Sequence, residues 1–138
     1  MLSRTAADLY WMSRYLERAE NLARMLEVSY SLSLMPQAGR SDGLDELAMS
    51  LLSSGTLDSY LERHTQLDAE RMLHFFALDE ENPASIYNCL RAARGNAHAV
   101  RGRITADMWE NLNATWLEMR SIAAGGLGRH GISHFCDW

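Results

Sequence analysis

The sequence contains no lysine, and all 13 basic residues among its 138 are arginines. A Walker-A phosphate loop, a Schiff-base enzyme and a lysine general base each require that amine, so these three kinds of chemistry are excluded. Any anion that this chain binds has to be met by arginine, the only strong cation left.

Cysteines and long apolar runs are also scarce. The two cysteines, Cys89 and Cys136, lie far apart and form neither a CxxC pair nor a disulfide framework. Charged residues interrupt every apolar run before 18 residues, and charges near the N-terminus exclude the apolar core of a signal peptide. We therefore expect a cytoplasmic protein with reduced thiols that neither spans nor binds a membrane.

The composition is that of a globular domain, with 47% hydrophobic and 22% charged residues. The net charge of −5 disfavours nucleic acid as a partner, because nucleic-acid binders are normally basic. The charge is unevenly distributed, since residues 1–85 are strongly acidic and residues 86–104 hold four arginines and no acid. The second segment is the one basic region that supports a binding hypothesis.

Apolar side chains recur at steps of three and four residues through most of the chain, and no strand-like alternation interrupts them. This pattern predicts an all-α bundle. The predicted long helices cover about 4–33, 84–103 and 106–123, and shorter ones cover about 44–53 and 67–78, with a further helical turn at 56–63. Residues 79–83 read as an acidic loop, Pro83 suits the first position of the next helix, and Thr105 is expected to cap the last one.

The first helix carries a dense set of charged and amide side chains: Arg14, Glu17, Arg18, Glu20, Asn21 and Arg24. One interpretation is a solvated helix face, in which neighbouring charges contribute only about 0.2–0.5 kcal/mol per pair. The other places Glu17, Arg18 and Arg24 at the edge of a wide apolar stripe. They would then form a half-buried network that a partner or an anionic ligand completes.

A second candidate surface lies on the helix predicted at 84–103. The spacing of its basic residues puts all four on one face: Arg91, Arg94, His98 and Arg101. This face suits phosphate or an acidic partner, or alternatively a solvated surface that meets the acidic helices of the same chain. Gly95 interrupts the helix at a cost of about 1 kcal/mol, and it indicates either close packing or simple tolerance.

Metal and nucleophile signals are weak. The sequence contains no Glu-x-x-His pair of the kind that di-iron bundles use. The tail residues His130, His134, Cys136 and Asp137 match no standard zinc spacing. Cys89 reads as a small buried thiol. We predict no metal, no cofactor and no catalytic residue of the chain's own.

Two blocks resemble the bacterial alpha-E domain family, a helical domain of unknown function named for a Glu-Arg motif. The first block reads LSRTA, LYWMSRY, ERAEN and AR at 2–6, 9–15, 17–21 and 23–24. The second reads CLRAAR, NA, VR and IT at 89–94, 96–97, 100–101 and 104–105, followed by Met108, Trp109, Glu110 and Asn113. The motif maps onto Glu17 and Arg18. Two departures are Ala7, where an acid is usual, and Gly95, where glutamate is usual.

The resemblance implies that residues 1–138 form a single helical unit, the N-terminal half of a larger alpha-E domain. It also implies proximity to ATP-grasp proteins and transglutaminase-like proteases, and hence a role in amide or peptide ligation or tagging. The leading hypothesis is a non-catalytic accessory that docks an ATP-grasp-type ligase. One alternative is half of an enzyme, with Glu17 as base and Arg18 as anion clamp. Another is a helical interaction module without a ligation role.

A half-domain also leaves part of its first helix without a neighbour. We therefore expect self-association through an exposed apolar stripe.

Overall fold

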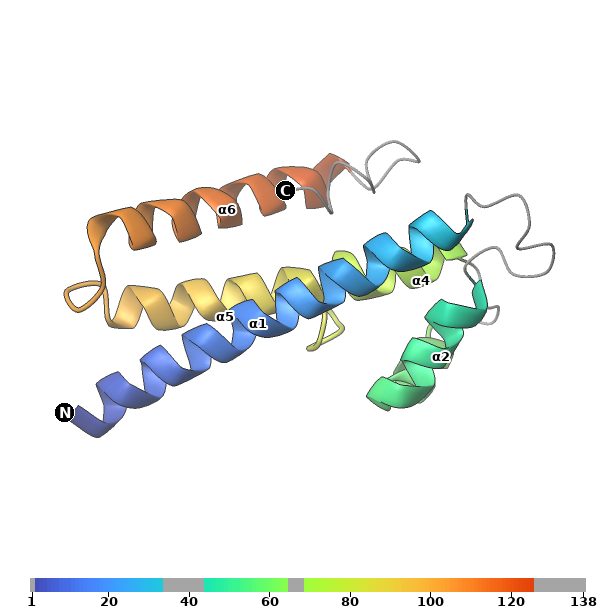
Figure 1. The fold of residues 1–138 in the computed structure, drawn as a ribbon, viewed down its shortest axis with the longest axis horizontal. Helices are drawn as coiled ribbons and strands as arrows, with labels where there is room; N and C mark the ends of the chain where they lie inside the picture. Colours follow the sequence, from blue (N-terminus) through green and yellow to red (C-terminus); the bar gives the residue numbers. More distant parts are fainter. Residues whose placement is uncertain (1, 34–43, 65–68, 126–138) are drawn as a thin grey trace.

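The fold is all-α and its framework is three long helices that run in alternating directions (Figure 1). The computed structural model describes residues 2–33, 44–64 and 69–125. Helix α1 spans Leu2–Ser33, α5 spans Ile86–Ala99 and α6 spans Ala106–Gly125. Helix α5 packs against α1 on one side and α6 on the other, so it is the central helix of the three.

Three shorter helices gather at the end of α1 that is remote from the N-terminus (Figure 1). They are α2 (Leu44–Ser54), α3 (Leu57–Leu61) and α4 (Ala69–Ala77). Helices α2 and α4 both contact α1, and α4 also contacts α5. The predicted helices at 44–53 and 67–78 and the turn at 56–63 are therefore present, although residues 67 and 68 lie outside the described part.

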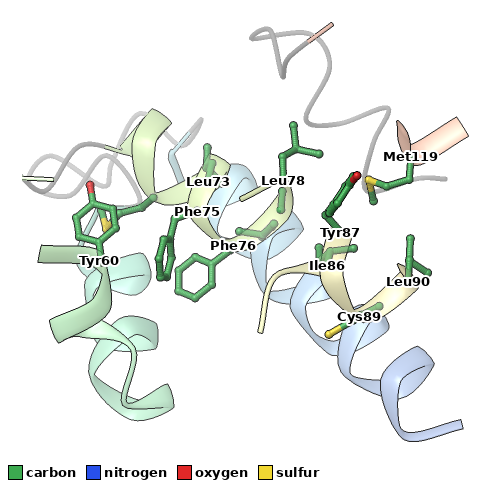
Figure 2. Close-up of a cluster of buried hydrophobic side chains, with 14 of the residues drawn as sticks. Tyr60, Leu73, Phe75, Phe76, Leu78, Ile86, Tyr87, Cys89, Leu90 and Met119 are labelled. Carbon is green, nitrogen blue, oxygen red and sulfur yellow. The ribbon is translucent and has the colours of Figure 1, made fainter. Parts of the chain in front are cut away.

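The main hydrophobic core forms where α4 meets α1, α3 and the first turns of α5. Figure 2 shows Tyr60, Phe75 and Phe76 at one end of it and Tyr87, Leu90 and Met119 at the other. Helix α1 reaches this core with Ala19 and Leu26, two buried residues seven positions apart. Seven residues are close to two helical turns, so both lie on one stripe of α1.

A smaller core lies nearer the N-terminus of α1, between the three long helices. Met12 of α1 and Leu112 of α6 converge there on Ala93 and Ala97 of α5. Both alanines are fully buried, and their small side chains let the neighbouring helices approach α5 closely.

Helix α5 is shorter at both ends than the predicted helix at about 84–103. Pro83 does not start the helix; Ser85 is its N-cap, and the Ser85 hydroxyl accepts a 3.2 Å hydrogen bond from the Asn88 amide. The helix ends at Ala99 rather than 103, where the chain turns through residues 100–104. The Thr105 cap of α6 is confirmed, because its hydroxyl accepts a 3.2 Å hydrogen bond from the Met108 amide.

The segment between α4 and α5 was predicted as an acidic loop, but much of it is buried. Four short polar side chains at steps of three residues turn inward, three in this segment and the last in the first turn of α5: Asp79, Asn82, Ser85 and Asn88. The Asn82 side-chain amide donates to the Phe75 carbonyl at 2.9 Å. The side-chain amide of Asn88 donates to the carbonyls of Glu80 and Asn82 at 2.8 and 2.7 Å. These side-chain bonds satisfy carbonyls that no helical backbone hydrogen bond reaches. They also fix the angle at which the chain enters α5.

Candidate functional site

The charged motif of α1 lies on the surface of the helix. Arg14 donates to Glu17 at 3.0 Å, and Arg24 pairs with Glu20 one turn earlier. About half or more of each of these four side chains is exposed. Arg18 and Asn21 are exposed as well. The geometry is that of the solvated face; it does not contain the half-buried network of Glu17, Arg18 and Arg24.

Arg18 differs from Arg14 and Arg24 because its guanidinium lies over an aromatic ring, 5.9 Å from the centroid of Tyr15. It is also near enough to Cys89 of α5 to favour the thiolate there. Arg18 therefore sits along the seam between α1 and α5, where its charge borders an apolar surface.

Two large aromatic side chains are exposed just before the motif. Tyr10 is 57% exposed and Trp11 45% exposed, and their rings meet edge to face at 5.3 Å. Trp11 also lies 5.9 Å from Tyr15. Aromatic groups of this size are normally buried, so these two rings form an unusual exposed apolar patch on α1.

The basic face predicted on α5 is divided in the structure. Arg101 lies beyond the end of α5, in the turn that precedes α6, so it does not continue the helical face. Arg94 and His98 turn toward α6 instead. The Nε of Arg94 donates to the Asn113 side chain at 2.9 Å, and both Arg94 and His98 contact the Trp109 ring. Arg91 and His98 remain exposed, and Arg94 is half-buried.

A shallow hollow opens on the other side of α5, along its seam with α1. Its volume is about 340 Å³, and it is lined by Trp11, Tyr15, Ala92, Gly95 and Asn96. Gly95 has no close neighbour, because a Cβ built at that position meets nothing within 4 Å. The glycine is therefore not required for close packing, and its missing side chain widens the hollow.

We expect the Gly95→Ala variant to be more stable than the wild type by about 0.5–1 kcal/mol, because alanine loses less backbone entropy in a helix. The added methyl group faces open space. Urea unfolding followed by circular dichroism measures the change. A loss of stability would show that Gly95 is structurally required after all.

Sequence reasoning missed a polar cluster that ties the turn after α3 to the α4–α5 loop. Arg63 forms salt bridges at 2.8 Å with the buried Asp79 and with the exposed Glu81. The hydrogen bond to Asp79 raises the pKa of the guanidinium above its ordinary value. The only signal in the sequence was the three-residue spacing of Asp79, Asn82, Ser85 and Asn88, a pattern of residues that hydrogen-bond to the backbone.

Two side chains on α5 have a raised pKa, and burial is the main cause for both. Burial raises the pKa of the Cys89 thiol, and Arg18 opposes this only in part, so the thiol stays protonated. Burial also raises the pKa of Tyr87, and a hydrogen bond to Glu80 adds to the effect. Both groups serve the core: Cys89 is almost completely buried and Tyr87 packs on Trp116 at 5.0 Å.

The described residues contain neither a grouped metal-ligand set nor a membrane-spanning helix. Among residues 2–33, 44–64 and 69–125, no three His, Cys, Asp or Glu side chains come together as a metal site requires. The candidates His130, His134, Cys136 and Asp137 lie outside these ranges. None of the described helices has the length and apolarity needed to cross a bilayer.

Comparison with known families decides what kind of domain carries this surface. A family described as a predicted alpha-helical domain with a conserved ER motif matches residues 1–138. The chain belongs to the Alpha-E family. The placement of that ER motif at Glu17 and Arg18 rests on the sequence resemblance and stays a prediction. That the Alpha-E chain forms the first half of a larger domain stays a prediction.

The Alpha-E chain is also similar to mycobacterial proteins. It is 28% identical over 123 residues to the "Uncharacterized protein Rv2567" of Mycobacterium tuberculosis (strain H37Rv) and, to the same extent, to the "Uncharacterized protein Mb2597" of Mycobacterium bovis. Each match covers 77% of this chain but only 13% of the relative, so the chain spans a small part of their length. No solved structure matches the chain.

Proposed function

We propose that this Alpha-E chain is a non-catalytic docking protein for an ATP-grasp-type ligase in an amide or peptide ligation or tagging system. The observation that carries docking is the exposed aromatic and arginine cluster of α1, formed by Tyr10, Trp11, Arg14 and Arg18. The class of the partner rests on the resemblance to a family that sits beside ATP-grasp proteins.

The chemistry of the cluster is that of an interaction surface. Tryptophan, tyrosine and arginine are the residues most enriched at the energetic centres of protein interfaces. A half-exposed Trp11 gains stabilisation when a partner covers it, since each Å² of apolar area removed from water contributes about 25 cal/mol. The surface is also held in place, because it stands on a helix whose adjoining stripe is packed on α5.

The test is binding to the purified ATP-grasp protein encoded beside an Alpha-E gene, measured by isothermal titration calorimetry. The Trp11→Ala variant is expected to bind at least about 30-fold more weakly, the equivalent of about 2 kcal/mol for an interface hot spot. Leu117→Ala is the matched control, because Leu117 is an apolar residue of α6 with similar exposure. It is expected to bind like the wild type.

Three results would contradict the proposal. One is the absence of binding, and a second is an equal loss of affinity in the two variants. The third is ligase or ATPase activity of this chain without its neighbour, which would favour an enzyme over an accessory. Circular dichroism of each variant shows whether a loss of binding comes from unfolding.

A further inference from the structure

We propose that the hollow between α1 and α5 at Gly95 receives an apolar side chain from an acidic segment of the partner. The inference rests on the proposed docking function and deepens it, because it names the chemistry of what docks. It also locates the contact, since Trp11 forms one wall of the hollow and Gly95 the gap in the other.

The shape of the hollow calls for an apolar group. Its walls are the aromatic rings of Trp11 and Tyr15 on α1 and the small residues Ala92 and Gly95 on α5, with Asn96 as the one polar residue of the lining. The volume of about 340 Å³ is enough for one large side chain and part of its neighbours. Because the fold does not need a glycine at 95, the helix carries its cost of about 1 kcal/mol without a packing reason.

The charge around the hollow calls for carboxylates. Arg18 lies over Tyr15, one wall of the hollow, and Arg91 precedes Gly95 by one helical turn on the same side of α5. Helix α5 has no acidic residue between Ile86 and Ala99. On α1, Glu17 is already paired with Arg14, and Asp8 lines a different hollow together with Arg4 and Arg103. The surroundings of the Gly95 hollow are therefore basic, and they complement an acidic segment.

A second hollow of similar size offers a comparison with the Gly95 hollow. It lies between α1 and α6, has a volume of about 330 Å³, and is lined by uncharged side chains that include Met12, Leu16, Met108 and Asn111. No charged residue in its lining indicates an occupant. It serves here as the matched control.

The experiment uses two synthetic probes and nuclear magnetic resonance of the labelled full chain. One probe is a peptide with a single central leucine flanked by glutamates, and the other has lysines in place of the glutamates. The acidic peptide is expected to shift the Gly95 and Ala92 amides and the Trp11 indole, and the lysine peptide is not. Raising the salt concentration from 50 to 500 mM is expected to weaken the acidic peptide at least about fivefold.

Two tryptophan substitutions then test the position. Gly95→Trp fills the hollow and is expected to weaken the acidic peptide at least tenfold, whereas Asn111→Trp adds the same bulk to the α1–α6 hollow and leaves the affinity unchanged. Arg18→Gln is expected to reduce both the affinity and its salt dependence. Melting curves identify a variant that fails to fold. If Gly95→Trp does not fold, the Arg18→Gln result decides whether the acidic peptide binds here, because Arg18 is exposed and its substitution leaves the core intact.

The proposal is overturned by any of three results: both peptides bind equally, neither binds at millimolar concentration, or Gly95→Trp behaves like Asn111→Trp. Concentration-dependent shifts at the hollow without peptide would also overturn it, because a second copy of the chain would then be the occupant. The peptide assay contains no ligase, so its failure is separate from a failure of the Trp11→Ala binding test.

Discussion

Substitution of Phe75 by alanine is expected to lower the free energy of unfolding by about 3–5 kcal/mol. Phe75 is completely buried in the main core, where its ring meets Tyr60 edge to face at 5.4 Å and Phe76 at 5.6 Å. The Arg63 guanidinium lies 5.6 Å from the same ring. The variant loses the buried ring, its aromatic contacts and the packing of α3 against α4, and a cavity remains.

The loss is a large share of the roughly 5–15 kcal/mol that holds a domain of this size together. Urea unfolding monitored by tryptophan fluorescence and by circular dichroism measures it. His74→Ala is the control, because His74 is the exposed neighbour of Phe75 on the same helix and should change stability by less than about 0.5 kcal/mol. A Phe75→Ala variant as stable as its control would mean that this core is not formed in solution.

The Asn88→Asp variant is expected to lose on the order of 3 kcal/mol at neutral pH, although it differs from the wild type by only one group. The Asn88 amide nitrogen donates to the carbonyls of Glu80, Asn82 and Asp79 at 2.8, 2.7 and 3.4 Å. An ionised carboxylate has no hydrogen to donate, so it would leave these carbonyls without a partner and repel them. In the described part of the chain, the Asn88 Oδ1 has no partner that could offset this loss.

The same variant should show a pH dependence of defined sign. Burial beside carbonyl oxygens disfavours the ionised form of the new carboxyl, so its pKa in the folded state lies above the ordinary value of about 3.9. The destabilisation is therefore greatest at neutral pH and shrinks as the pH falls through the folded-state pKa, because the protonated acid can again donate one hydrogen bond.

Asn111→Asp provides the control, since Asn111 is exposed on α6 and receives the same change of charge. Its stability relative to the wild type should vary little between pH 4 and pH 7. Unfolding curves at several pH values compare the two variants. An Asn88→Asp penalty that is small at neutral pH, or that grows on acidification, would contradict the hydrogen-bond pattern.

The long helices could be predicted from the sequence because their periodicity is strong. Met12, Ala19 and Leu26 mark the buried stripe of α1 without any knowledge of its neighbours. The ends of α5 could not be predicted in this way. Pro83 and Ser85 both fit a helix start, and only the hydrogen bond between Ser85 and the Asn88 amide settles which residue is the cap.

The candidate site was also predictable only in part. The position of Glu17 and Arg18 on one helix follows from their adjacency in the sequence, but their exposure depends on which neighbours cover α1. The basic face differs from the prediction for a related reason: helical spacing aligns Arg94 and His98 with Arg91, yet the first two contact Trp109 of α6. Spacing within one helix contains no information about the side chain that packs across from it.

The central position of α5 has a consequence for the order in which the chain folds. Helices α5 and α6 are neighbours in sequence and can pair through a short loop, whereas α1 must wait for a helix that lies more than fifty residues away. During synthesis at about 5–20 residues per second, α1 leaves the ribosome several seconds before α5 is complete. For that interval Met12, whose buried partners Ala93 and Ala97 belong to α5, stays open to water, whereas Leu26 can already pack against α2 and α4.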